Sequence, residues 1–161
     1  SRVVTVTSGV QYFGNIQWDD LQGNIKYDRW ASYAQSKLAN VMFGLELNSK
    51  LKENNSKTSS ILAHPGFART NLQTKSVEAN QLWQEKLAYK LMGPIFQSAR
   101  MGAMPQIVAA TLPSAKGGEQ YGPRFNFRGV PKICRNAPKA LNQNSRKRLW
   151  KISENFIKKF I

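Results

Sequence analysis

The sequence predicts an α/β fold in which about three strands of a parallel sheet pack against flanking helices. Residues 3–7, Val-Val-Thr-Val-Thr, form a β-branched run that is typical of a strand buried on both faces. Residues 30–52 place apolar side chains at helical spacing, and residues 58–63 then form a second buried run. A strand, a helix and a strand in this order predict two parallel strands joined by a crossover helix.

The rest of the chain extends this pattern within one domain, residues 1–161. With 41% hydrophobic and 20% charged residues, the chain can bury a core of its own. Periodicity and turn residues predict helices at 78–92, 98–112 and 145–161, a third strand at 120–127, and loops at 12–28 and 129–144.

The composition also suggests where the chain works. No apolar run approaches the roughly 20 residues needed to span a bilayer, and residues 1–6 lack the layout of a signal peptide. The single cysteine, Cys134, suits a reducing compartment and cannot build a thiolate metal site alone, so no metal is expected. We expect a cytoplasmic protein.

The charge is strongly positive. Lys and Arg outnumber Asp and Glu by 24 to nine, which gives a formal net charge of +15. Thirteen of the basic residues but only two of the acidic ones lie in residues 100–161. Such an excess can attract a polyanion such as nucleic acid. Aromatic residues do not alternate regularly with these charges and no zinc-finger spacing is present, so a solvated basic surface is favoured over a nucleic-acid site.

Tyr33 and Lys37 are the first candidates for chemistry, because residues four apart on a helix project from one face. An ammonium beside a phenol favours the phenolate, which would suit Tyr33 as a general acid or base. Ser8 follows the first strand, and parallel sheets bind ligands beyond the carboxyl ends of their strands. The alternatives are a turn or cap role for Ser8 and a purely structural role for the pair.

Three motifs carry a family resemblance: Thr7-Ser8 after the first strand, Tyr33-Ala-Gln-Ser-Lys37 followed by Leu-Ala-Asn, and His64-Pro-Gly-Phe-Ala-Arg-Thr70. Together they resemble the C-terminal half of a short-chain dehydrogenase/reductase, in the branch that contains retinol dehydrogenases. The resemblance implies a Rossmann-type doubly wound parallel sheet. The Gly-rich pyrophosphate turn that begins such enzymes does not occur here, so the chain is expected to be a partial domain without the N-terminal nucleotide-binding half.

The resemblance also implies hydride transfer between a nicotinamide cofactor, NADP in preference to NAD, and a carbonyl or alcohol. Tyr33 would exchange the proton, Ser8 would hydrogen-bond the substrate oxygen, and Lys37 would assist Tyr33 and bind the nicotinamide ribose. The Pro65-Gly66 turn would let the backbone approach the nicotinamide, and Thr70 would contact the cofactor. His64 is expected to be structural.

Residues 73–97 would form the substrate lid of this family, with an apolar lining that suits an apolar substrate or an ordinary core: Trp83, Leu87, Leu91 and Met92. Activity of this chain alone is doubtful, and its partner would be the absent N-terminal half or a second copy. The alternatives to an enzyme are a nucleic-acid-binding protein and a membrane-surface protein. The membrane alternative rests on residues 145–161, where aromatic residues lie beside lysines, although packing of that helix on its own domain is favoured.

Overall fold

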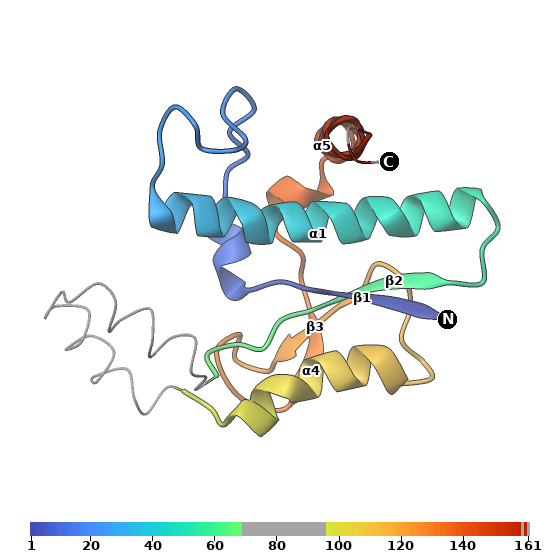
Figure 1. Cartoon of the computed structure of the whole chain (residues 1–161). Coiled ribbons are helices and arrows are strands. Elements are labelled where there is room, and N and C mark those ends of the chain that lie inside the picture. Colours follow the sequence, from blue (N-terminus) through green and yellow to red (C-terminus); the bar gives the residue numbers. More distant parts are fainter. Residues whose placement is uncertain (69–95, 159, 161) are drawn as a thin grey trace, which may run out of the picture.

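The computed structural model describes residues 1–68, 96–158 and 160 of the chain. Its strands form one mixed four-stranded sheet in the order β1-β2-β3-β4, with α1 on one face and α4 on the other (Figure 1). The described elements follow the chain in the order β1 (Arg2–Val6), η1 (Gly9–Phe13), α1 (Arg29–Glu53), β2 (Ser59–Ala63), α4 (Ala99–Thr111), β3 (Gln120–Pro123), β4 (Pro131–Cys134), η3 (Pro138–Leu141) and α5 (Gln143–Ile157). The predicted α/β class is confirmed.

Strand β2 is the centre of the sheet. It pairs in parallel with β1, with Val4 opposite Ile61, and in parallel with β3, with Leu62 opposite Gln120. Successive side chains of a strand point to opposite faces, so Leu62 enters the core under α1 while Ile61 enters the core over α4. Both faces of β2 are therefore covered, which explains why Ile61, Leu62 and Ala63 are apolar without alternation.

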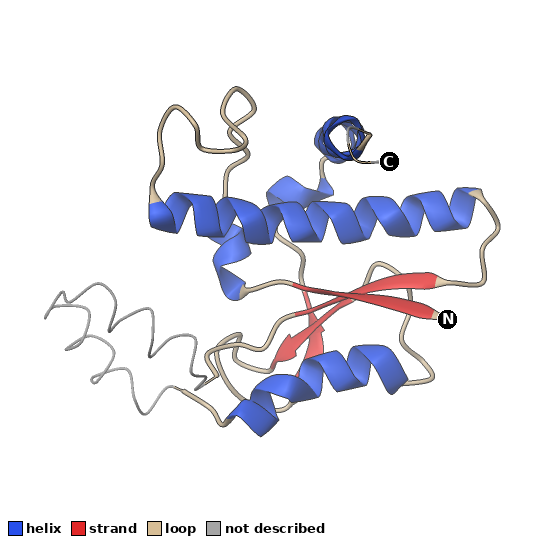
Figure 2. Cartoon of the chain, viewed as in Figure 1, coloured by secondary structure: helices blue, strands red, loops and turns tan. Residues whose placement is uncertain are grey.

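Helix α1 runs for 25 residues and lies above the sheet in Figure 2. Its first turn is capped by Asp28, whose carboxylate accepts a hydrogen bond of 2.7 Å from the Ala31 N–H. Its buried stripe includes Leu38, Val41 and Met42, which pack in one cluster with Leu62. The helix predicted at 30–52 is thus present with nearly the expected ends.

The C-terminal third differs from the prediction in β3, in β4 and in the short helix η3. The stretch 129–144 was expected to be a loop because of its Gly and Pro residues, but β4 forms inside it, antiparallel to β3. Strand β3 ends at Pro123, earlier than the predicted residue 127, because Asn126 turns the chain back with a φ of 65°. Pairing with β3 therefore overrides the local composition of β4. Proline is tolerated here because Pro123 is the last residue of β3 and Pro131 is the first residue of β4.

Helix α5 crosses the outer side of α1 and closes the described part of the chain (Figure 1). Its N-cap is Asn142, whose side-chain oxygen accepts from the Ser145 N–H at 2.9 Å. No residue of α5 is fully buried. Among the described residues, no helix has both the length and the apolar character needed to cross a bilayer.

Candidate functional site

The end of β1 is tied to α1 by two side-chain hydrogen bonds. The Thr7 hydroxyl donates to the backbone carbonyl of Lys37 at 2.8 Å, and the Asn40 amide donates to the backbone carbonyl of Val6 at 2.9 Å. These bonds fix the helix turn that carries Lys37 over the carboxyl end of β1. Position and rotation of α1 at this point are therefore set by polar contacts as well as by the core.

The same end of β1 is tied to β2. The Thr7 N–H donates to the carbonyl of Ala63 at 2.8 Å, which continues the parallel register in which Val6 lies opposite Ala63. Thr7-Ser8 and His64-Pro65 are consequently neighbours at one edge of the sheet. This is the edge where parallel sheets bind ligands.

Ser8 lies between β1 and η1 in an extended conformation, with φ −145° and ψ 157°. Its Oγ caps η1 by accepting from the Val10 N–H at 3.5 Å, the outer limit of a hydrogen bond. A serine hydroxyl that accepts one weak bond still has its proton to donate. The cap role and a role toward a ligand are thus compatible at Ser8.

Tyr33 and Lys37 face each other on the first turns of α1. The Lys37 Nζ lies 5.3 Å from the centre of the Tyr33 ring, and 41% of Tyr33 is exposed. A cation over an aromatic ring is attracted by its π electrons, so the contact holds the ammonium close to the phenol. The predicted pair is brought together, and it is open to a ligand.

The turn after β2 packs closely against residues 123–127. Gly66 has a φ of +65°, and a Cβ there would lie 2.5 Å from the Phe127 carbonyl oxygen. The Phe67 N–H donates to that same carbonyl at 2.8 Å. Glycine is therefore required by the backbone conformation and by the packing of residues 123–127, a cause that the sequence did not reveal.

The Gln97 side chain holds this turn through two hydrogen bonds. Gln97 was not identified as a positioning residue from the sequence. Its Nε2 donates to the Pro65 carbonyl at 2.7 Å, and its Oε1 accepts from the Gly129 N–H at 3.1 Å. Local sequence gives no signal for these long-range bonds. Asn40, by contrast, could have been found, because residues 33, 37 and 40 have the spacing of one helix face.

His64 precedes the turn and is fully buried, with 0% exposed. Neither ring nitrogen has a hydrogen-bond partner, and burial lowers the pKa of His64 to about 4. Gly122 makes room for the imidazole, because a Cβ at that position would lie 2.0 Å from the His64 Nε2. A neutral, enclosed histidine agrees with the structural role expected for it.

Some predicted site residues cannot be placed. Thr70 and the apolar residues assigned to the lid, Trp83, Leu87, Leu91 and Met92, lie outside the described residues. In the described part of the chain, no three His, Cys, Asp or Glu side chains gather as a metal site would require. A groove of about 360 Å³ lies between α1 and α5, and neither Ser8 nor the pair of Tyr33 and Lys37 lines it.

The side chains at the sheet edge offer several hydrogen-bond donors to a ligand. A serine hydroxyl, a phenol and an ammonium can each donate hydrogen bonds, and the latter two lie on one exposed helix face. Such donors suit a ligand that carries hydroxyl or carbonyl oxygens. The turn at Gly66 presents backbone at the neighbouring strand end.

No protein-family model matches the sequence. Curated relatives do: the chain is 33% identical to human (Homo sapiens) retinol dehydrogenase 12 over 95% of its length and 44% of that protein. It is 32% identical to human polyprenol dehydrogenase, over 93% of this chain and 43% of the relative. It is also 32% identical to human retinol dehydrogenase 14, over 96% of this chain and 43% of the relative. The chain thus spans about half the length of the curated relatives it matches.

The chain also matches about half the length of a solved structure. An uncharacterized protein from Mycobacterium Paratuberculosis superposes with a TM-score of 0.76 and 31% sequence identity, covering 98% of this chain and 50% of that one. The described fold therefore corresponds to half of that solved chain.

Proposed function

We propose that this chain, which belongs to the short-chain dehydrogenase/reductase family, carries the proton-transfer residues of an oxidoreductase that interconverts an alcohol and a carbonyl with NADP or NAD. The dehydrogenase names of its relatives support oxidation or reduction as the reaction class. The observation that carries the proposal is the Thr7 junction, which joins β1 to Lys37 and to Ala63 at 2.8 Å each. It brings the two predicted groups of site residues to one edge.

In the proposed reduction, Tyr33 donates its hydroxyl proton to the substrate oxygen, and in oxidation it takes the proton back. Ser8 donates a hydrogen bond to the same oxygen and so orients the carbonyl. Lys37 is proposed to assist Tyr33, and its ammonium lies 5.3 Å from the centre of the Tyr33 ring. A nicotinamide cofactor, when bound, supplies or accepts the hydride at the substrate carbon.

The cofactor would be held by Lys37 and Tyr33 at the nicotinamide ribose. Pro65 and Gly66, on the adjacent strand end, and Thr70 complete the proposed contacts. NADP remains preferred over NAD in this proposal. A separate part of the protein, or a second copy of the chain, would have to hold the adenine end, since relatives of this chain are about twice as long.

The substrate is proposed to be an apolar alcohol or the matching aldehyde or ketone. Retinol and polyprenol, which name the relatives, are both apolar alcohols. The apolar residues assigned to the lid, Trp83, Leu87, Leu91 and Met92, have the chemistry to enclose such a chain.

The test is a titration of the purified chain with NADPH and NADH, followed by cofactor fluorescence. We expect saturable binding that Lys37→Ala weakens at least tenfold, about the loss of one charge-assisted hydrogen bond. Lys57→Ala is the matched control, because Lys57 is an exposed lysine in the turn before β2. Equal affinity in the Lys37→Ala variant and the wild type would contradict the proposed cofactor site.

A further inference from the structure

The hairpin that joins β3 to β4 presents aromatic rings and cations together. Its residues 124–128, Arg-Phe-Asn-Phe-Arg, are all exposed. Phe125 is 59% exposed and Phe127 is 39% exposed, and the centres of their rings lie 6.4 Å apart with a tilt of 31°. Apolar surface gains free energy when a partner removes it from water. The hairpin therefore offers two neighbouring rings to a partner.

The backbone of this hairpin is held in one conformation. The Arg124 N–H donates to the Val130 carbonyl at 2.9 Å, and the Phe125 N–H donates to the Arg128 carbonyl at 3.1 Å. The hairpin is also bonded to the turn after β2, through the Phe127 carbonyl. Binding therefore does not require this segment to be ordered first, which lowers the entropic cost of association.

Cations lie among and beside the rings. The Arg124 guanidinium lies 5.7 Å from the centre of the Phe125 ring, so cation and ring form one surface. Arg128 and Lys132, which follow within the hairpin and β4, are exposed as well. A solvated basic surface needs no exposed rings, whereas this hairpin supplies both kinds of side chain.

Little negative charge lies near these cations. From residue 96 to residue 135 the sequence holds one acidic residue, Glu119. Its carboxylate already accepts hydrogen bonds from the Lys116 N–H and the Tyr121 hydroxyl, at 2.8 Å each. The turn that bonds to the hairpin, residues 64–68, contains no Asp or Glu. The positive field of the hairpin is consequently not cancelled locally.

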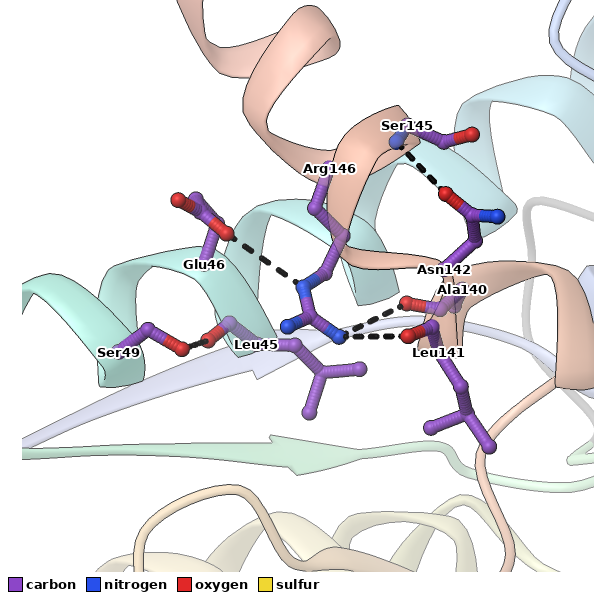
Figure 3. Close-up of polar contacts among 8 residues, drawn as sticks. All are labelled: Leu45, Glu46, Ser49, Ala140, Leu141, Asn142, Ser145 and Arg146. Atoms are coloured by element: carbon purple, nitrogen blue, oxygen red, sulfur yellow. Dashed lines mark hydrogen bonds and ion pairs between the residues drawn. The ribbon is translucent and has the colours of Figure 1, made fainter.

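Helix α5 is also basic, but its central ring and its inner cation are engaged within the domain. Arg146 pairs with Glu46 at 3.4 Å and donates to the Ala140 carbonyl at 3.3 Å (Figure 3). The rings of Phe43 and Trp150 stack on each other at 5.5 Å. The hairpin, rather than α5, therefore combines exposed rings with cations.

We infer that the 124–130 hairpin binds a single-stranded nucleic acid, with bases stacked on Phe125 and Phe127 and phosphates on the neighbouring cations. A single strand offers both accessible base faces and regular negative charge. In a duplex the base faces are covered by neighbouring bases, and an acidic peptide would match the cations alone. A second copy of the chain carries the same charge of +15 and would be repelled. The inference goes beyond the proposed function and uses none of its site residues.

The test is fluorescence anisotropy of a labelled oligothymidylate titrated with the chain at several salt concentrations. We expect saturable binding that falls with salt. Phe125→Leu should weaken it about tenfold with an unchanged circular dichroism spectrum, because leucine keeps the apolar character but has no flat ring for a base. Arg124→Gln should lower the slope of log affinity against log salt by about 0.7, the contribution of one phosphate contact on a single strand.

The matched controls remove a ring and a charge elsewhere. Phe13→Leu changes a ring that is 81% exposed at the end of η1, and Lys57→Gln removes an exposed charge before β2. Both variants should bind as the wild type does. Equal loss in Phe13→Leu and Phe125→Leu would overturn the assignment to the hairpin. Equal affinity for a duplex of the same length, unchanged by Phe125→Leu, would show a purely electrostatic surface and overturn the single strand as partner. Absence of binding at low salt would also overturn the inference.

Discussion

The carboxyl edge of the sheet and helix α5 are held in opposite ways. At the sheet edge, Thr7 and Asn40 bond to backbone carbonyls, and β2 beside them is buried on both faces. In α5, no residue is fully buried, and the helix is anchored by the Arg146 contacts and one aromatic stack. The sheet edge is thus fixed by polar contacts and burial, whereas α5 rests on the outside of the domain.

The largest expected effect lies at the sheet edge. Under the proposed function, Tyr33→Phe removes the hydroxyl that would exchange the proton, so we expect a loss of about 10²–10⁴-fold in kcat/KM. The thermal midpoint should stay near that of the wild type, because 41% of Tyr33 is exposed and the change removes only its hydroxyl. An oxidation assay with retinol as the probe alcohol measures kcat/KM, and calorimetry measures the thermal midpoint. Retention of most activity would refute the role of Tyr33.

The second effect is a pH dependence of stability at the same edge. The pKa of His64 is lowered from 6.5 to about 4 in the fold, so the folded state favours the neutral ring. The preference for the neutral ring contributes about 3 kcal/mol to the free energy of unfolding above pH 6.5. This stabilisation is lost as the pH falls from 6.5 toward 4.

Urea unfolding between pH 7 and pH 4 measures this loss, and His64→Gln supplies the comparison because His64 is the single histidine of the chain. The wild type should lose more stability on acidification than the variant. Parallel pH curves for the two proteins would show that the buried imidazole does not titrate as inferred.

The third and smallest effect concerns α5. Glu46→Gln removes the charge that Arg146 contacts at 3.4 Å, and we expect a cost of about 2 kcal/mol in the free energy of unfolding. Glu53→Gln, an exposed carboxylate at the end of α1, is the matched control and should change stability little. If both variants lose the same amount, the Arg146 contact does not anchor α5.

The elements around the sheet edge were predictable because local sequence and burial agree there. The run that ends β2 is apolar because both faces of that strand are covered, and the Tyr33 to Lys37 spacing is a property of one helix. Residues 3–7 form the expected strand, but Val3 and Val6 are 39% and 45% exposed, so the predicted burial on both faces is wrong for β1. Strand β4 was not predictable from its composition, because its formation depends on pairing with β3.

The candidate site was predictable only in part. The spacing identified Tyr33 and Lys37, but no local pattern could show that Thr7 bonds to Lys37 or that Gln97 reaches Pro65. Both bonds join residues about 30 positions apart in the chain, so they become visible only in the folded structure. The reason for Gly66 was also hidden, because it lies in the packing of Phe127.

The shallow seating of α5 has a consequence for native-state hydrogen exchange. Its amides can open when the helix lifts from α1, while those of β2 are released only when the sheet itself comes apart. Amide protons of Gln143–Ile157 should thus exchange through local fluctuations, and those of Ser59–Ala63 through global unfolding. With two exchange regimes in one small domain, α5 could open locally without disturbing the residues at the sheet edge.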